Sequence, residues 1–261
     1  MAFRVIPLGA LLLSGCTGHG PISHIPPFAR VPYEPFSRAT LVQVALREWR
    51  LFGQTVGDKN PRKPEREPGL WQRVGEYWWL GLNRDSPASG WTGKHDGHGK
   101  VFAPEVDGEF AWSAAFISYV MRIAAAAEAF PYSADHAHYI NEAKRMKLGQ
   151  ARGWLVVAER PEDHAPVPGD LICHGRGSAE GLRYDDLPAP GLFPSHCDIV
   201  VDTLGHGAID VIGGNVADAV TLRHIPVTAD GRLARPDGTV LDPDRRWFTV
   251  LRVTEPHAQG Q

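Results

Sequence analysis

Apolar residues in the first half of the chain recur every three or four positions, the spacing of one face of an α-helix. A first helix is predicted to begin with Thr40 as its N-cap and to run to about Phe52. A second helix is predicted over residues 70–82, where the apolar stripe consists of Trp71, Val74, Trp78 and Leu82. We interpret the aromatic residues of this stripe as core packing.

The stretch "AWSAAFISYVMR", residues 111–122, predicts a third helix with the broadest apolar face: Trp112, Ala115, Phe116, Tyr119, Val120 and Ile123. Ser113 lies at its beginning, where unpaired backbone N–H groups and the helix dipole favour negative charge. A nucleophile placed there would gain stabilisation of the anion formed on attack. The alternative is that Ser113 only caps the helix, which serine does well.

After residue 165 the pattern changes to short runs rich in β-forming residues, separated by Gly, Pro and Asp. The runs are "PVPGDLICHGR", "HCDIVVDTL", "AIDVIGGNV", "AVTLRHIPV" and "RRWFTVLRV". They predict an antiparallel sheet of about five strands. Because the helices precede the strands, we expect an α+β fold in which the N-terminal helices pack against one side of the sheet.

The N-terminus predicts export. Arg4 precedes the apolar run "VIPLGALLL", and "LSGC" ends at Cys16; the run is too short to span a bilayer as a mature helix. It resembles a bacterial lipoprotein signal at residues 1–15, with Cys16 lipidated, and Thr17 after it favours the outer membrane, facing the periplasm. We expect a Pro- and Gly-rich tether at 16–38, one domain at 39–255 and a disordered tail at 256–261.

Composition narrows the classes of partner. The chain has 261 residues, 43% of them hydrophobic and 22% charged, enough for one substantial core. Its formal net charge is −3, without a basic run, so nucleic acid is not an expected partner. The pairs His95 with His98 and His136 with His138 lack a second ligand pair at a recognisable spacing, so no metal site and no cofactor are predicted.

Several motifs occur in an order typical of one superfamily. The segments "AWSAAFISY", "PGDLI", "SHCDI" and "GGNVADAV" stand in this order between about residues 109 and 253. Their sequence resembles the NlpC and CHAP branches of the papain-like superfamily, which include cell-wall amidases and endopeptidases, and a narrower branch of lipoproteins with a domain of unknown function. Each motif alone is weak, but the ordered set is more specific.

The resemblance implies a papain-like fold and a catalytic constellation of Ser113 as nucleophile, His196 as general base and Asn215 as the group that orients the imidazole. Both later residues have simpler alternatives: a strand-end histidine and a turn asparagine. Trp112, beside the nucleophile, is a candidate substrate contact. So are His136 and His138, which we expect in an exposed loop before a helix.

Ser113 stands where the family has cysteine. A thiol, with a reference pKa of about 8.5, can be held as a thiolate, whereas a serine must lose its proton as it attacks. The domain is therefore either an active serine hydrolase or an inert descendant, and geometry separates the two. Cys197 is not expected to replace the nucleophile, because it faces away from the cleft if His196 faces it.

The remaining cysteines, Cys173 and Cys197, can meet across an antiparallel pairing of "DLICH" with "HCDIV". We predict a structural disulfide, with two free buried cysteines as the alternative. The long segment between these strands, "GRGSAEGLRYDDLPAPGLFPS", is predicted to be a substrate-facing flap.

Together these features predict a lipid-anchored periplasmic protein that cleaves or binds amide-containing peptides of peptidoglycan. A noncatalytic lipoprotein that holds a wall peptide or a protein partner in the same cleft is the alternative from another class. A third interpretation is coincidence of the motifs in an ordinary α+β domain, in which case His196 and Asn215 would lie far from Ser113. Fold alone does not fix the substrate.

Overall fold

The computed structural model describes residues 35–57, 63–103, 110–203, 205 and 207–255. Contacts divide the chain into Met1–Tyr33 and Glu34–Gln261, and every described residue lies in the second unit. The predicted signal peptide, Cys16 and the tail at 256–261 therefore lie outside the described residues, as does most of the predicted tether. No described helix combines the length and the apolar character needed to cross a bilayer.

The described strands form one seven-stranded sheet in the order β1-β6-β5-β4-β3-β7-β2. The five predicted runs are all present, as β3 (Leu171–Gly175), β4 (Ser195–Asp202), β5 (Ala208–Gly213), β6 (Thr221–Pro226) and β7 (Trp247–Val253). All neighbouring pairs are antiparallel except β1 with β6, so the fold is α+β.

The predicted number of about five strands is wrong, because two short strands lie at the edges of the sheet. These are β1 (Thr55–Val56), which pairs with β6, and β2 (Val156–Glu159), which pairs with β7. Two and four residues are too few to show a clear alternation of apolar and polar positions. Both strands also precede the region in which strand-like runs dominate the sequence.

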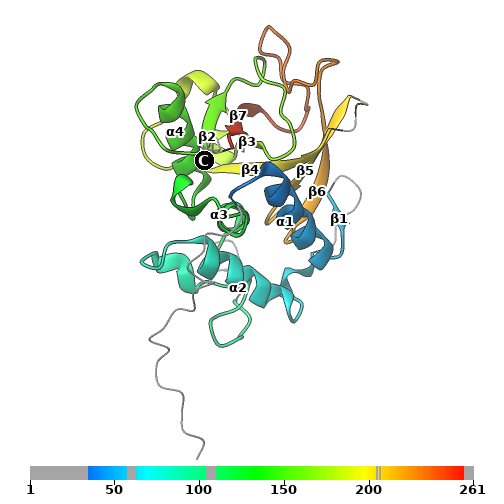
Figure 1. Ribbon diagram of the computed structural model, residues 1–261. Helices are drawn as coiled ribbons and strands as arrows, with labels where there is room; N and C mark the ends of the chain where they lie inside the picture. Colours follow the sequence, from blue (N-terminus) through cyan, green and yellow to red (C-terminus); the bar gives the residue numbers. More distant parts are fainter. Residues whose placement is uncertain (1–34, 58–62, 104–109, 204, 206, 256–261) are drawn as a thin grey trace, which may run out of the picture. The chain divides into compact units, whose positions relative to one another are not determined.

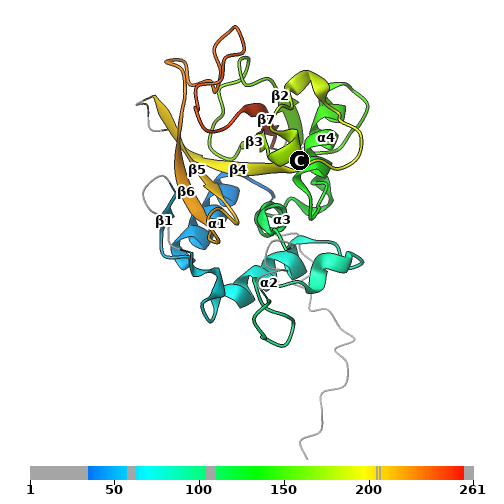
Figure 2. The same ribbon diagram turned by 180° about the vertical axis from the view of Figure 1, so that it is seen from behind.

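The described residues form four α-helices beside the sheet: α1 (Arg38–Leu51), α2 (Leu70–Gly81), α3 (Ser113–Ile123) and α4 (His136–Lys147). α3 contacts both α2 and β4, so it lies between the second helix and the sheet (Figures 1 and 2). The predicted cap of the first helix is wrong. Ser37 is the N-cap, and its hydroxyl accepts a hydrogen bond from the Thr40 backbone N–H.

A buried ion pair joins the helices. The Glu48 carboxylate of α1 is fully buried and lies 2.6 Å from an Arg73 guanidinium nitrogen of α2. It also accepts hydrogen bonds from Arg47 and from the Tyr77 hydroxyl, 2.8 Å away. Burial alone would raise the pKa of Glu48, but the bonds and charges of the two arginines outweigh it and hold the pKa below its usual value.

The pairing of β3 with β4 sorts side chains onto two faces. Cys173 lies opposite Cys197 and His174 lies opposite His196. Both cysteines belong to the large core shared with the helices, and their sulfurs form a disulfide of 2.08 Å. Side chains one position along the strands point the other way, where Ile172 and Val200 join a second, smaller core.

The double substitution Cys173→Ala and Cys197→Ala is expected to lower the free energy of unfolding by about 3 kcal/mol, since the crosslink closes a segment of 24 residues in the unfolded chain. Urea denaturation measures this change. Reductant should destabilise the wild-type protein to a similar extent and leave the double variant unaffected. Equal sensitivity of the two proteins to reductant would contradict the assignment.

Candidate functional site

Ser113 is the first residue of α3, and it does not occupy the cap position. The N-cap is Trp112, whose side chain makes no capping hydrogen bond. The Ser113 side chain is buried, with 3% of the residue exposed, and its Oγ lies 2.6 Å from Nε2 of His136. The hydroxyl is thus next to an imidazole and beside the unpaired N–H groups of the first helical turn. The contact is within the hydrogen-bond distance that a hydroxyl nucleophile and a general base require.

His136 is the first residue of α4 and is buried, rather than lying in an exposed loop as predicted from the sequence. Its Nδ1 is hydrogen-bonded to the Tyr139 hydroxyl, one helical turn away. Burial, assisted by the neighbouring imidazole of His196, lowers the pKa of His136 well below its usual value. The ring is therefore neutral near pH 7 and can accept a proton from Ser113.

His196, the predicted base, lies beside this pair. Its ring centroid is 5.3 Å from that of His136, and its Nε2 lies 2.9 Å from Oδ1 of Asp198. The other oxygen of Asp198 forms an ion pair with Arg223. Burial lowers the pKa of His196 and the attraction of Asp198 opposes it, so the net pKa is below the usual value. Within the described residues, Nδ1 of His196 makes no hydrogen bond.

The three imidazoles of His136, His196 and His174 form a row, which we call the histidine row. The His174 ring centroid lies 5.5 Å from that of His196 and 4.9 Å from that of Trp247. Burial, together with the neighbouring imidazole of His196, lowers the pKa of His174 to about 3. No group of three or more His, Cys, Asp or Glu side chains in the described part of the chain is arranged to hold a metal ion.

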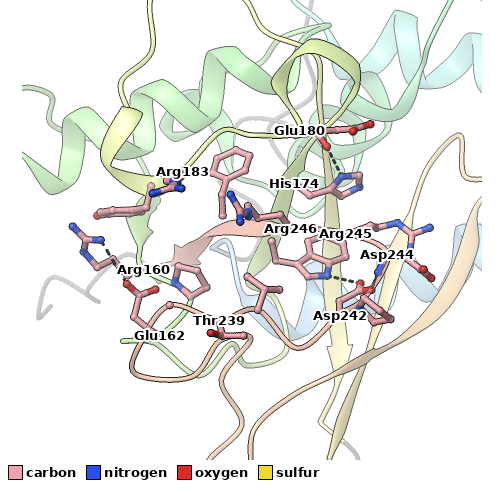
Figure 3. Close-up of a pocket in the computed structure, with 18 of the residues that line it drawn as sticks. Arg160, Glu162, His174, Glu180, Arg183, Thr239, Asp242, Asp244, Arg245 and Arg246 are labelled. Carbon is pink, nitrogen blue, oxygen red and sulfur yellow. Dashed lines mark hydrogen bonds and ion pairs between the residues drawn. The ribbon is translucent and has the colours of Figure 1, made fainter.

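A pocket of about 1100 Å³ opens at the His174 end of the row (Figure 3). Its walls come from the residues that follow β2, the end of β3, the segment after β3, and the connection that leads into β7 together with the start of that strand. The predicted flap contributes Glu180, Arg183 and Tyr184. The flap is fastened to α4 by two hydrogen bonds of 2.9 Å between the Asn141 side chain and the Ala189 backbone. Ser113 does not line this pocket.

The structure does not bring Asn215 to His196 as a hydrogen-bond partner. Asn215 is a half-buried turn residue with a φ of 56°, which asparagine tolerates better than most residues. Asp198 orients His196 instead, because residues two apart on a strand share a face. The turn interpretation of Asn215 therefore describes what the structure shows.

The two residues before Asn215 are glycines, and the site leaves no space for a side chain at either position. A Cβ atom on Gly213 would lie 1.9 Å from Oδ1 of Asp198 and 2.9 Å from Nε2 of His196. A Cβ atom on Gly214 would lie 2.6 Å from Cβ of Phe116. The absence of side chains thus leaves space for the His196–Asp198 pair on one side and for α3 on the other.

The other candidate substrate contacts are not at the pocket. Trp112 is fully buried and packs against Phe52 and Tyr77 in the helical core. His138 is exposed on α4. The sequence interpretation missed Asp198, His174, Arg223 and Tyr139. Three of them carry local signals: Asp198 is two residues from His196, Tyr139 is three residues from His136, and the expected strand pairing places His174 opposite His196.

Stability is expected to fall as the pH drops below about 6.5. The buried histidines have lowered pKa values in the folded state, so between pH 6.5 and about 3 the unfolded chain binds more protons. Above pH 6.5 the histidines are neutral in both the folded and the unfolded state, so stability is no longer reduced by their protonation. The variant His174→Asn removes one such group. It should reduce the slope of the free energy of unfolding against pH by up to about 1.4 kcal/mol per pH unit. Urea denaturation at several pH values measures it, and an unchanged slope would contradict burial of His174.

Gly213→Ala is expected to destabilise the protein by about 1–3 kcal/mol, because the added methyl group must displace Asp198 or His196. Thermal and urea denaturation measure the loss. Gly90→Ala is the matched control, since nothing lies within 4 Å of its added Cβ and its φ is ordinary. Equal stability of the two variants would show that the space beside Asp198 is not needed.

Comparison with known proteins assigns the chain to a family. Searches of curated proteins and of solved structures found no match to the chain. Residues 65–253, more than half of the chain, match the family described as "Uncharacterized protein conserved in bacteria (DUF2272)". The matched region includes Ser113, the whole histidine row and the pocket. The chain is therefore a member of the bacterial DUF2272 family.

Proposed function

We propose that the protein is a serine hydrolase that cleaves amide bonds in peptides of the bacterial cell wall. The observation that carries the proposal is the 2.6 Å contact between Ser113 Oγ and His136 Nε2 at the N-terminus of α3. A hydroxyl needs a neutral base that takes its proton during attack, and burial keeps His136 neutral. Tyr139 holds the other ring nitrogen and so fixes the orientation of the imidazole.

The proposed reaction follows from these contacts. Ser113 Oγ attacks the carbonyl carbon while its proton passes to Nε2 of His136. Backbone N–H groups of the first turn of α3 stabilise the oxyanion of the tetrahedral intermediate. The intermediate then collapses as His136 returns the proton to the departing amine. Water attacks the acyl-enzyme in the second half of the reaction, again with His136 as base, and releases the carboxylic acid.

His196 is the second candidate base. Asp198 holds its Nε2, and its ring lies next to that of His136. A nucleophile at a helix N-terminus with a histidine near the beginning of a strand is the arrangement implied by the resemblance to papain-like NlpC and CHAP proteins. We include a papain-like fold in the proposal on this basis. In this chain the carboxylate of Asp198 takes the orienting role proposed for Asn215.

The location of the protein belongs to the same proposal. The apolar run before Cys16 supports export and a lipid anchor, with the domain in the periplasm and the anchor in the outer membrane. Peptidoglycan peptides are within reach of a domain placed there by a tether. This combination of location and site favours wall peptides over other amide substrates.

A noncatalytic binding protein is the second candidate function. The observation that favours it is the burial of the site: Ser113 and His136 are 3% and 5% exposed, and Ser113 is not among the residues that line the pocket. A ligand in the pocket would then be held without reaching the nucleophile. The presence of serine where the resemblance to papain-like proteins implies cysteine fits this alternative as well.

Incubation of the purified protein with peptidoglycan is expected to release peptide fragments detectable by mass spectrometry. Ser113→Ala should abolish release, because it removes the hydroxyl that attacks in the proposed reaction. His136→Asn should reduce the rate by about 100-fold or more, the usual contribution of a general base. His196→Asn tests the second candidate base.

The outcomes separate the two functions. If the wild-type protein and Ser113→Ala both release nothing while both remain folded, the hydrolase proposal fails and the binding function remains. If Ser113→Cys gains cleavage that the wild-type protein lacks, the site is a decayed cysteine hydrolase. If His136→Asn keeps full activity while His196→Asn loses it, His196 is the base in place of His136.

A further inference from the structure

The pocket beside His174 contains an unusual set of charges. Five arginines and six acidic residues contribute to its walls: Arg160, Arg176, Arg183, Arg245 and Arg246, with Glu162, Glu180, Asp185, Asp237, Asp242 and Asp244. They come from separate segments of the chain and converge on one cavity of about 1100 Å³. Which of these charges already have partners decides what the pocket can bind.

Most of the acidic groups are already engaged. Asp185 and Glu162 form ion pairs with Arg160, with the Glu162 oxygen 3.5 Å away. Asp242 accepts a hydrogen bond of 2.7 Å from Nε1 of Trp247, and Asp237 accepts one of 2.9 Å from the Thr239 backbone. Two acidic side chains of the pocket, those of Glu180 and Asp244, have no such partner within the described residues.

The arginines show the opposite pattern. Within the described part of the chain, the guanidinium groups of Arg176, Arg183, Arg245 and Arg246 form no ion pair and no hydrogen bond with another side chain. Figure 3 shows the side chain of Arg246 in the middle of the pocket, and Arg183 entering from the flap. The pocket as a whole holds six carboxylates and five guanidinium groups. Among the described residues, however, four of the guanidinium groups have their hydrogen-bond donors free for a ligand.

One of these arginines is also poorly solvated. Arg245 is only partly exposed, and its burial together with the charge of Arg223 lowers its pKa, although the nearby carboxylates, of which Asp242 has the largest effect, partly oppose this. A cation in this position is disfavoured unless an anion approaches it. A ligand that brings a negative group into the pocket would relieve this repulsion.

We propose that this pocket binds a short peptide through the peptide's free carboxylate groups, with Arg183 and Arg246 as the main contacts. The inference rests on the proposed function and names the acidic character of its substrate. Guanidinium groups bind carboxylates by two parallel hydrogen bonds. Glu180 and Asp244 would accept hydrogen bonds from peptide N–H or ammonium groups, and would repel a doubly charged phosphate. Trp247 and Phe248 supply apolar wall to the same pocket.

The position of the pocket relates binding to the proposed reaction. His174 lines the pocket and is also the last member of the histidine row, which leads through His196 to His136 and Ser113. A peptide anchored by its carboxylate in the pocket would lie beside this row. The pocket thus recognises the acidic part of the substrate, while Ser113 acts on an amide bond elsewhere in the same peptide.

Calorimetric titration of the Ser113→Ala protein tests binding without turnover. The first probe is a synthetic tetrapeptide of wall-stem composition with free carboxylates, and the second is the same peptide with each carboxylate converted to a carboxamide. We expect the carboxamide to bind at least about tenfold more weakly, and Arg183→Gln and Arg246→Gln each to weaken binding of the acidic peptide by about tenfold. Higher salt should weaken binding too.

Arg152→Gln is the matched control, because Arg152 is an exposed arginine outside the pocket. It should bind as the parent protein does. Equal affinity for the two peptides, or unchanged affinity in both pocket variants, would overturn the proposal. So would inorganic phosphate that displaces the peptide at similar concentration, since the site would then be a general anion site.

The experiment distinguishes this inference from the proposed function. If the Ser113→Ala protein binds the acidic peptide and the wild-type protein releases no product from peptidoglycan, the pocket stands and the hydrolase proposal fails. If the wild-type protein releases product and the two arginine variants do so at the wild-type rate and KM, the hydrolase stands and the pocket assignment fails.

Discussion

The register between β3 and β4 is the constraint on which the site depends. It places Cys173 opposite Cys197 and His174 opposite His196, so one pairing provides both the disulfide and two of the three imidazoles. A shift of one residue would turn the imidazoles into the helical core and the sulfurs out of it. The covalent bond between the strands therefore stabilises the arrangement of the histidines as well as the fold.

Burial of the histidines is the second physical factor that determines the properties of the site. It keeps the histidine row neutral, since an imidazolium without water is disfavoured. Asp198 is the carboxylate that contacts the row, and its pKa is held well below its usual value because the attraction of Arg223 and His196 exceeds the cost of its own burial. A neutral base next to Ser113 suits a hydroxyl, which gives up its proton only during attack. It suits a stored thiolate less well, because a thiolate is stabilised by an imidazolium.

Much of the fold could be predicted because it follows from local periodicity. The five main strands and the helices over residues 70–82 and 111–122 each carry enough repeating apolar positions to be identified. The edge strands β1 and β2 are too short to do so, and the first helix begins at Arg38 because Ser37 rather than Thr40 caps it. In the candidate site, motif order drew attention to Ser113 and His196, which the structure places near each other through His136. Asp198 and His174 were missed although alternation along a strand and across a pair places them beside His196.

The sequence by itself determined the α+β class, the pairing that joins Cys173 to Cys197, and the position of Ser113 at the start of a helix, because each depends on neighbours along the chain or on one strand pair. Only the tertiary structure decided that His136 meets Ser113 and that Asp198 and not Asn215 holds His196. It also decided that four arginines without a side-chain partner among the described residues share a pocket. Such contacts join segments tens of residues apart. They depend on how helices and loops pack on the sheet, which no local pattern encodes.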